Sequence, residues 1–241
     1  DGYNALVLHG GLTWKQAVIL RAYGKFLRQL GISLSDDYLR SSLAEHPEIA
    51  CNLVALFETR FDPEIPHDDR TGALERTRYR ILEHLDRVTS LDEDKILRSY
   101  LHAISATLRT NYYQQDNIGN FKPYVSFKIA TRELEEAPKP RPFREIFVYS
   151  PRVEGVHLRA GPVARGGLRW SDRREDFRTE ILGLVKAQQV KNAVIVPVGA
   201  KGGFVPKNLP RDGSREEIQA EGIACYQTFI SGLLDITDNL D

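Results

Sequence analysis

The sequence predicts an α+β protein, with an N-terminal helical region over residues 1–118 and an α/β domain with a mixed sheet over residues 119–241. Two observations carry this prediction. Apolar residues recur at three- and four-residue steps through the first half of the chain, which is the period of an amphipathic helix. From about residue 120, runs with strand periodicity alternate with helical runs, which is typical of an α/β layer. The sequence contains no G-x-G-x-x-G motif, so we expect no Rossmann domain within this chain.

The composition argues against several classes of protein. The 33 Lys and Arg residues balance the 33 Asp and Glu residues, so a general attraction to nucleic acid or to an anionic membrane is not indicated. No apolar stretch approaches the roughly 18 residues of a membrane span. Two cysteines without CxxC spacing and six histidines without H-x-x-x-H spacing predict neither a disulfide framework nor a bound metal. These features favour a cytoplasmic protein that binds neither nucleic acid nor membrane.

The helical region contains recognisable helix boundaries. Thr13 and Gln16 have the spacing of a capping box, Ser90 and Glu93 repeat it, and Gly31 is a plausible helix stop. We expect helices over residues 13–30, from residue 35 onward, and over 48–61, 74–88 and 92–113, with a polar loop at 62–73. Nothing in this region has catalytic spacing, so we interpret it as a helical scaffold or an interaction module.

The α/β domain begins where apolar and polar residues start to alternate. We expect strands at 124–129, 145–150, 155–160 and 192–198, and helices at 174–190 and 214–236. The stretch 192–198, NAVIVPV, is apolar throughout, as in strands that are buried on both faces. Ser171 or Asp172 is the expected N-cap of the first of these helices, and Ser214 that of the second.

Between residues 161 and 178 the chain combines five arginines with the glycine pair Gly166 and Gly167. The arginines are Arg165, Arg169, Arg173, Arg174 and Arg178. Adjacent glycines let a ligand approach the backbone, and arginines can hold a carboxylate or phosphate in a bidentate manner. The alternative is a turn in which the arginines pair with the nearby acids at 172, 175 and 176. Spacing alone leaves both interpretations open.

Lys201 is the second candidate, because it follows the expected strand 192–198 and precedes two glycines. The stretch is not a Walker A loop, since no glycine stands at the required position and no Ser or Thr follows the lysine. An amine in a partly dry site beside other cations has a lowered pKa and can act as a general base or polarise a carbonyl. Lys191 and Arg165 are the cations that could hold an anionic substrate there. The alternative is a solvated lysine in a turn.

These residues carry a resemblance. The stretch 165–207, which runs from RGGLRWSDRRED to GAKGGFVPK, is similar to the core of the very large, NAD-specific bacterial glutamate dehydrogenases. EIFVYSPRVEGVHLRAG at 145–161 and TLRTNYYQ at 107–114 resemble the same family. The resemblance implies oxidative deamination of L-glutamate to 2-oxoglutarate and ammonium, with NAD as hydride acceptor. It also implies a homo-oligomeric enzyme in which a separate domain, beyond Asp241, binds NAD.

The resemblance further implies roles for single residues. Lys201 matches the catalytic lysine that polarises the carbonyl or imine and activates water. Lys191 matches a lysine that binds a substrate carboxylate. Arg165 stands where the shorter glutamate dehydrogenases have a lysine for the distal carboxylate. Gly166 and Gly167 line the same loop, and Arg169 is the arginine of the G-G-L-R motif, which completes the expected substrate-binding set.

Two other functions compete with this one. A non-catalytic module that senses an amino acid would use the same cations without chemistry. A nucleic-acid binder would use the arginine cluster, but the balanced charge argues against it. The chain has no methionine and no initiator residue, and we expect it to be part of a longer polypeptide. On its own, the 241-residue chain should be inactive as a dehydrogenase.

Overall fold

The computed structural model describes residues 2–32, 34–164, 166–191 and 199–237, and for residues 9 and 189–191 it describes the backbone alone. Contacts divide the chain into two compact units, residues 1–106 and residues 107–241. Helices dominate the first unit and a mixed sheet dominates the second, as the α+β prediction expects. Within the described residues, no helix is both long enough and apolar enough to cross a membrane.

The first unit is built from six helices in the described residues. They are α1 (Gly2–His9), α2 (Trp14–Gln29), α3 (Asp36–Glu45), α4 (Pro47–Phe61), α5 (His67–Leu85) and α6 (Leu91–Ala106). The capping box predicted before α2 is confirmed, because the side chains of Thr13 and Gln16 each bond the other's backbone N–H. Gly31 follows α2 with a φ of 90°, a left-handed conformation that suits glycine. Ser35 caps α3 through the backbone N–H of Tyr38.

The start of α5 differs from the prediction. The helix begins at His67, so most of the expected polar loop 62–73 is helical. Pro66 stands just outside the helix, and Asp68 and Asp69 occupy the first turn, where negative charge is favourable. The polar composition of the stretch therefore reflects the exposed face of a helix rather than a loop.

The second unit contains a six-stranded sheet in the order β1-β2-β3-β4-β6-β5. Its strands are β1 (Thr107–Thr110), β2 (Val125–Ile129), β3 (Arg144–Tyr149), β4 (Val153–Arg159), β5 (Leu168–Trp170) and β6 (Ala200–Pro206). The pairs are antiparallel except for β5, which runs parallel to β6. The three strands expected near residues 125, 146 and 156 are confirmed as β2, β3 and β4.

Strand β1 was predicted as the end of a helix, and that prediction is wrong. Helix α6 ends at Ala106, and residues 107–110 pair with β2. Leu108, which the helical period would place on the apolar side of the helix expected over 92–113, is 39% exposed. The β-branched residues Thr107 and Thr110 favour an extended chain, and pairing with β2 decides the outcome.

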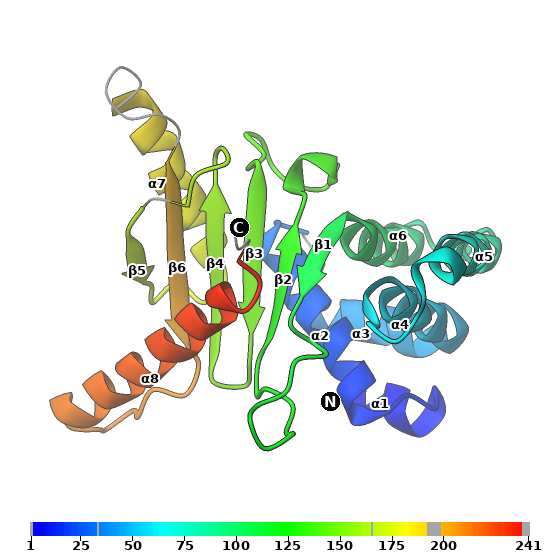
Figure 1. The fold of residues 1–241 in the computed structure, drawn as a ribbon, viewed down its shortest axis with the longest axis horizontal. Helices are drawn as coiled ribbons and strands as arrows, with labels where there is room; N and C mark the ends of the chain where they lie inside the picture. Colours follow the sequence, from blue (N-terminus) through cyan, green and yellow to red (C-terminus); the bar gives the residue numbers. More distant parts are fainter. Residues whose placement is uncertain (1, 33, 165, 192–198, 238–241) are drawn as a thin grey trace. The chain divides into compact units, whose positions relative to one another are not determined.

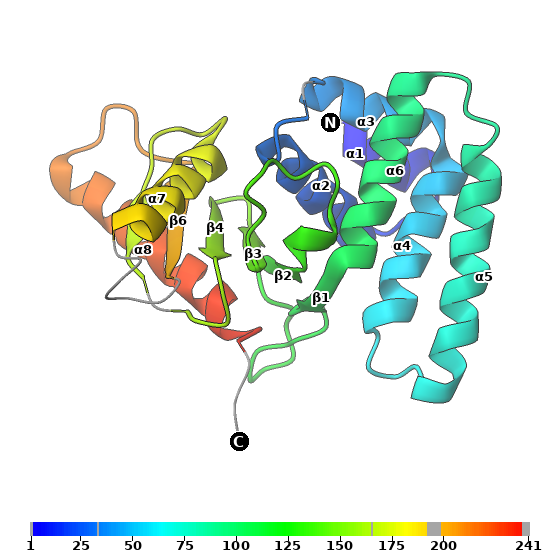
Figure 2. The same cartoon turned by 90° about the horizontal axis from the view of Figure 1, so that it is seen from above.

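Helices α7 (Phe177–Lys191) and α8 (Arg215–Leu234) cover opposite faces of this sheet (Figures 1 and 2). A Cβ at Gly203 would lie 2.7 Å from Cγ1 of Ile181 on α7, whereas a Cβ at Gly155 would lie 2.5 Å from the Phe229 ring on α8. Gly203 pairs with Val156, and neighbouring residues of a strand point to opposite faces. The glycines therefore let each helix approach the sheet closely.

Two expectations about α7 and α8 have different outcomes. Ser214 caps α8 in a capping box with Glu217, as predicted. The expected cap of α7 at Ser171 or Asp172 is wrong, because the helix begins five residues later, at Phe177. The Ser171 hydroxyl instead donates to Glu180 within the helix, at 2.5 Å.

Strand β6 changes the interpretation of Lys201. Residues 200–206 form the strand, so Lys201 lies within a strand and not in the glycine turn that was expected. Glycine is a poor strand former, but a Cβ at Gly202 would lie 3.1 Å from the His157 ring, and Gly203 is in close contact with α7. Close packing therefore explains the two glycines. The strand expected at 192–198 lies outside the described residues.

Candidate functional site

The backbone of the glycine pair Gly166 and Gly167 packs against the backbone at the start of β6. A Cβ at Gly166 would overlap the carbonyl oxygen of Ala200 and lie 2.5 Å from its carbonyl carbon. The backbone N–H of Gly202 donates to the carbonyl of Gly167 at 3.2 Å. Main chain therefore packs directly on main chain, which is possible only because position 166 has no side chain.

Lys201 lies beside this contact. Its side chain is half-buried, and its Nζ would be 3.6 Å from a Cβ at Gly167, which is ordinary van der Waals contact. Lys201 pairs with Leu158 of β4 and points to the face of the sheet that α7 covers, because Gly203, two residues further along β6, also faces α7. The structure thus brings Gly166, Gly167 and Lys201 together.

Gln188 is a residue of this site that the sequence reasoning missed. It lies on α7, and its amide would be within 2.7 to 2.9 Å of a Cβ at Gly199, the residue before β6. Its Oε1 is buried and has no hydrogen-bond partner among the described residues. A buried acceptor without a donor is uncommon and suggests a place for a ligand or water. Its position three residues before Lys191, on the same face of a helix, was the available signal.

The other predicted residues are placed less completely. Lys191 is the last residue of α7, and the structure describes its backbone only. Arg165 lies outside the described residues. Arg169 lies in β5, and its Nε is 2.5 Å from Oε1 of Glu180, while its side chain is 56% exposed. The geometry therefore places Arg169 next to the glycine pair, with one edge of its guanidinium bonded to α7.

The remaining arginines of the cluster form contacts within the protein. Arg173 pairs with Asp176, as in the turn interpretation, and this contact holds the pKa of that carboxyl below its usual range. Arg178 is fully buried and pairs with Glu145 of β3. Arg178 therefore does not belong to an exposed anion clamp, because it points into the interior between α7 and the sheet.

His157 lies on the α8 face of the sheet, opposite Gly202 on β6 and opposite Ile146 on β3. Its side chain is buried, and within the described part of the chain its Nδ1 has no hydrogen-bond partner. Burial, with a smaller contribution from nearby Arg159, lowers its pKa to about 4. The ring is therefore neutral at physiological pH.

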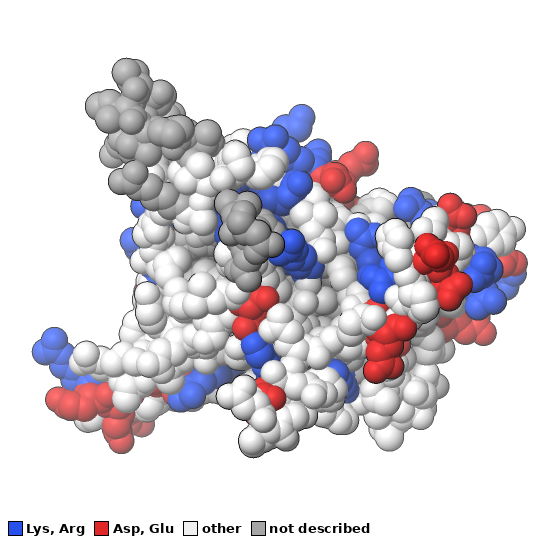
Figure 3. All heavy atoms as spheres, viewed as in Figure 1, with Lys and Arg blue, Asp and Glu red and all other residues white. Residues whose placement is uncertain are grey.

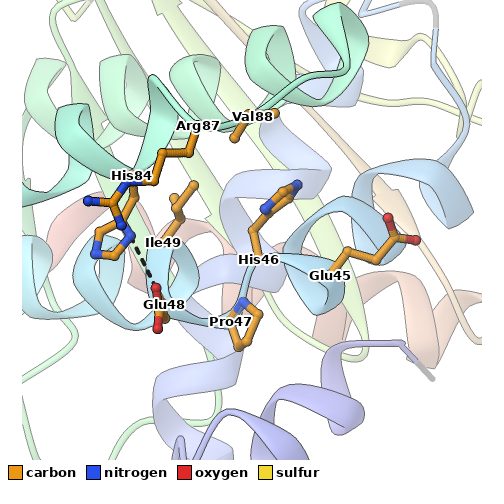
Figure 4. Close-up of a pocket in the computed structure, with 8 residues that line it drawn as sticks. All are labelled: Glu45, His46, Pro47, Glu48, Ile49, His84, Arg87 and Val88. Carbon is orange, nitrogen blue, oxygen red and sulfur yellow. Dashed lines mark ion pairs between the residues drawn. The ribbon is translucent and has the colours of Figure 1, made fainter.

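A pocket of about 320 Å³ opens in the helical unit, where α4 begins and α5 ends (Figure 4). Nδ1 of His84 is 3.1 Å from Glu48, and Nε2 of His46 is 2.9 Å from Glu93. Acidic and basic side chains are interspersed over this unit (Figure 3). Among the described residues, no cluster of three or more His, Cys, Asp or Glu could hold a metal.

Comparison with known proteins agrees with the resemblance. Residues 80–241 match the family model for the bacterial NAD-glutamate dehydrogenase catalytic domain, and residues 1–63 match that for glutamate dehydrogenase helical motif 3. Proteins named NAD-specific glutamate dehydrogenase from Pseudomonas aeruginosa, Halomonas elongata and Mycobacterium tuberculosis are 60%, 58% and 54% identical to the chain over its whole length. The chain spans about 15% of the length of each of these relatives. It belongs to the bacterial NAD-glutamate dehydrogenase family.

Proposed function

We propose that the polypeptide containing this chain oxidatively deaminates L-glutamate to 2-oxoglutarate and ammonium, with NAD as hydride acceptor. Unit 107–241 would supply the substrate-binding part of the catalytic core, and unit 1–106 would act as its helical scaffold. The observation that carries the proposal is the contact of Gly166 and Gly167 with β6, which leaves Lys201 beside exposed main chain. The names of the relatives support the choice of reaction.

Lys201 is the proposed catalytic residue. Its amine would polarise the carbonyl or imine at the α-carbon and activate the water that attacks it. Lys201 pairs with Leu158 of β4, and its neighbour Gly202 donates its backbone N–H to the Gly167 carbonyl, so the amine is presented from a rigid support. Without a side chain at 166 or 167, a substrate can lie against the main chain.

The proposed carboxylate-binding groups come from two directions. Arg165, Gly166 and Gly167 belong to the loop before β5, and Lys191 belongs to the end of α7. Arg169 adds positive charge next to the glycine pair, which favours a dicarboxylate over a neutral amino acid. Gln188 adds an amide on the same side as Lys191, and its oxygen, which has no partner among the described residues, would accept a hydrogen bond from the substrate ammonium group.

NAD, when bound, accepts the hydride from the α-carbon. The sequence of this chain has no G-x-G-x-x-G motif, so we propose that another part of the polypeptide holds most of the cofactor. The chain alone should therefore show no dehydrogenase activity. We further propose a homo-oligomer in the cytoplasm; both cysteines are free, as a reducing compartment would allow.

Lys201→Ala in the full-length protein tests the proposal. Loss of a general acid–base group should lower kcat about 10²- to 10⁴-fold with little change in glutamate binding. Lys186→Ala is the matched control, because Lys186 lies on the exposed side of α7. Lys186→Ala should leave kcat and the affinity for glutamate within about twofold of the wild-type values, as expected for a surface change that contacts no substrate.

The outcome separates the enzyme from the amino-acid sensor. If Lys201→Ala weakens glutamate binding and leaves turnover intact, Lys201 is a ligand-binding residue without a role in the chemistry. Production of NADH from glutamate by the isolated 241-residue chain would contradict the assignment of NAD binding to the rest of the polypeptide.

A further inference from the structure

An ion pair between Glu145 and Arg178 is buried completely beneath α7, with both side chains at 0% exposure. Nε and Nη2 of Arg178 each donate to a different carboxylate oxygen of Glu145, and both distances are 2.7 Å. The Thr131 hydroxyl donates to the same carboxylate at 3.3 Å. The contact is bidentate, so it fixes the direction as well as the distance between the two side chains.

Stability alone does not account for such a pair. Burying two charges costs several kcal/mol each, and apolar residues of similar volume often give equal or greater stability. A bidentate pair differs from an apolar contact because it tolerates neither sliding nor rotation of one element against the other. The pair therefore fixes the position of α7 on the sheet.

The ion pair lies on the same face of the sheet as the proposed site. Glu145 pairs with Leu158, and Leu158 pairs with Lys201, so Glu145 and Lys201 lie in one row across three strands. Residues paired in this way point to the same face, here the face under α7. Two inter-strand steps of about 4.8 Å place Glu145 and Lys201 roughly 10 Å apart.

Arg178 lies near the start of the helix that carries Gln188 and Lys191 at its other end. Glu180 holds the same first turns, because it accepts a hydrogen bond from the Ser171 hydroxyl and forms an ion pair with Arg169 of β5, each at 2.5 Å. Helix α7 is thus tied to β3 on one side and to β5 on the other. The spacing between Gln188, near the C-terminal end of α7, and Lys201 depends on both contacts.

We propose that Glu145 and Arg178 are positioning residues for glutamate binding, which hold α7 on the sheet so that Gln188 and Lys201 can contact one substrate. This inference rests on the proposed function. A displacement of about 1 Å can reduce the rate of an enzyme up to 10²-fold, so a small shift of α7 is enough to impair the site.

The test uses the full-length protein with three variants: Arg178→Lys, Glu145→Gln and Thr131→Val. The first two lose the bidentate ion pair, and the third removes only the hydroxyl, so it should fold even if the others do not. Lys186→Ala serves as the control on α7. Two properties are measured, namely hydrogen exchange of the amides in 177–191 and the KM values for glutamate and for NAD.

Amide exchange in α7 should rise about tenfold in Arg178→Lys and Glu145→Gln and about twofold in Thr131→Val, and stay unchanged in α2 and α4. KM for glutamate should rise about tenfold in the first two variants while KM for NAD stays within twofold. A purely structural pair would lower the active fraction, and hence kcat, with both KM values unchanged.

If amide hydrogen exchange in α7 is unchanged in the variants that fold, the ion pair does not hold α7 and the inference is overturned, whatever the activity. Faster exchange in α7 with an unchanged glutamate KM overturns the link to substrate binding. If the wild-type protein oxidises no glutamate while the exchange in α7 responds as expected, the proposed function fails and the role of the pair in holding α7 stands.

Discussion

At the scale of single residues, Gly166 and Gly167 are adjacent but are expected to differ in tolerance. A Cβ at 166 meets the main chain of Ala200, which cannot move without disturbing β6, whereas a Cβ at 167 meets only Nζ of Lys201 at 3.6 Å. Gly166→Ala should destabilise the protein by about 1–3 kcal/mol and abolish glutamate binding. Gly167→Ala should keep the melting temperature and raise the glutamate KM a few-fold. Thermal unfolding and steady-state kinetics of the two variants distinguish them, and equal melting temperatures would contradict the contact at 166.

His157 is expected to make stability depend on pH. Its pKa is about 4 in the folded protein, because burial disfavours the charged ring, and about 6.5 when unfolded. Between these values the unfolded chain binds the extra proton, so stability should fall as the pH drops from 6.5 to 4, by about 3 kcal/mol in total. His157→Phe should remove this dependence.

Urea unfolding at pH 7 and pH 4.5 measures the effect. The exposed His67 provides the control, and His67→Gln should follow the wild-type pH dependence. Parallel pH dependences of wild type and His157→Phe would show that the ring is protonated as readily in the folded state as in the unfolded one.

The sequence could predict only part of the candidate site, because some contacts join residues that are far apart along the chain. Motif resemblance assigned Gly166, Gly167 and Lys201 to one site, and in the structure Gly167 lies beside Lys201 while Gly166 contacts Ala200. The burial of Arg178 was not predictable from its neighbours, because its partner Glu145 is 33 positions away on another element. Local acids at 172, 175 and 176 offered equally good partners on spacing alone.

At the scale of elements, helices with strong caps were predicted well and strands rich in glycine were not. Thr13 and Ser214 mark their helices because capping is a local interaction. Strand β6 contains Gly202 and Gly203, which propensity alone assigns to a turn. Pairing on both sides and the close approach of α7 decide its conformation, and these are interactions between distant segments.

Helix α2 illustrates a glycine whose role is packing rather than conformation. A Cβ at Gly24 would overlap the hydroxyl of Tyr3 and lie 2.5 Å from that of Tyr100, and these two buried hydroxyls bond each other at 3.2 Å. Alanine favours a helix by about 1 kcal/mol over glycine, so propensity alone predicts stabilisation. We expect the steric overlap to dominate, with a net loss of about 1–3 kcal/mol in Gly24→Ala.

Chemical denaturation of Gly24→Ala measures this balance. Gly72→Ala on α5 is a suitable control, because its Cβ would contact only the flexible end of Arg76 at 3.2 Å. A stabilised Gly24→Ala variant would mean that Tyr3 and Tyr100 move apart at little cost.

At the scale of the whole molecule, the boundary of the family model and the boundary of the structural units differ. The catalytic-domain match begins at residue 80, inside α5, whereas the sheet-containing unit begins at residue 107. The apolar face of α6 lies in the helical unit, where it packs against α2, α3 and α4. Its large buried apolar side chains are Ile96, Leu97, Tyr100, Leu101 and Ile104.

This difference predicts the behaviour of two fragments. Residues 107–241 contain all six strands, both covering helices and the core around Phe229 and Phe204, so we expect this fragment to unfold cooperatively as a monomer. Residues 80–241 add α6 without its packing partners, which leaves its apolar face in water and favours association. Light scattering and binding of an apolar dye should rise in the longer fragment and stay low in the shorter one. If the longer fragment were the better behaved of the two, α6 would have to be stabilised by the sheet-containing unit, and residue 80 rather than residue 107 would mark where independent folding begins.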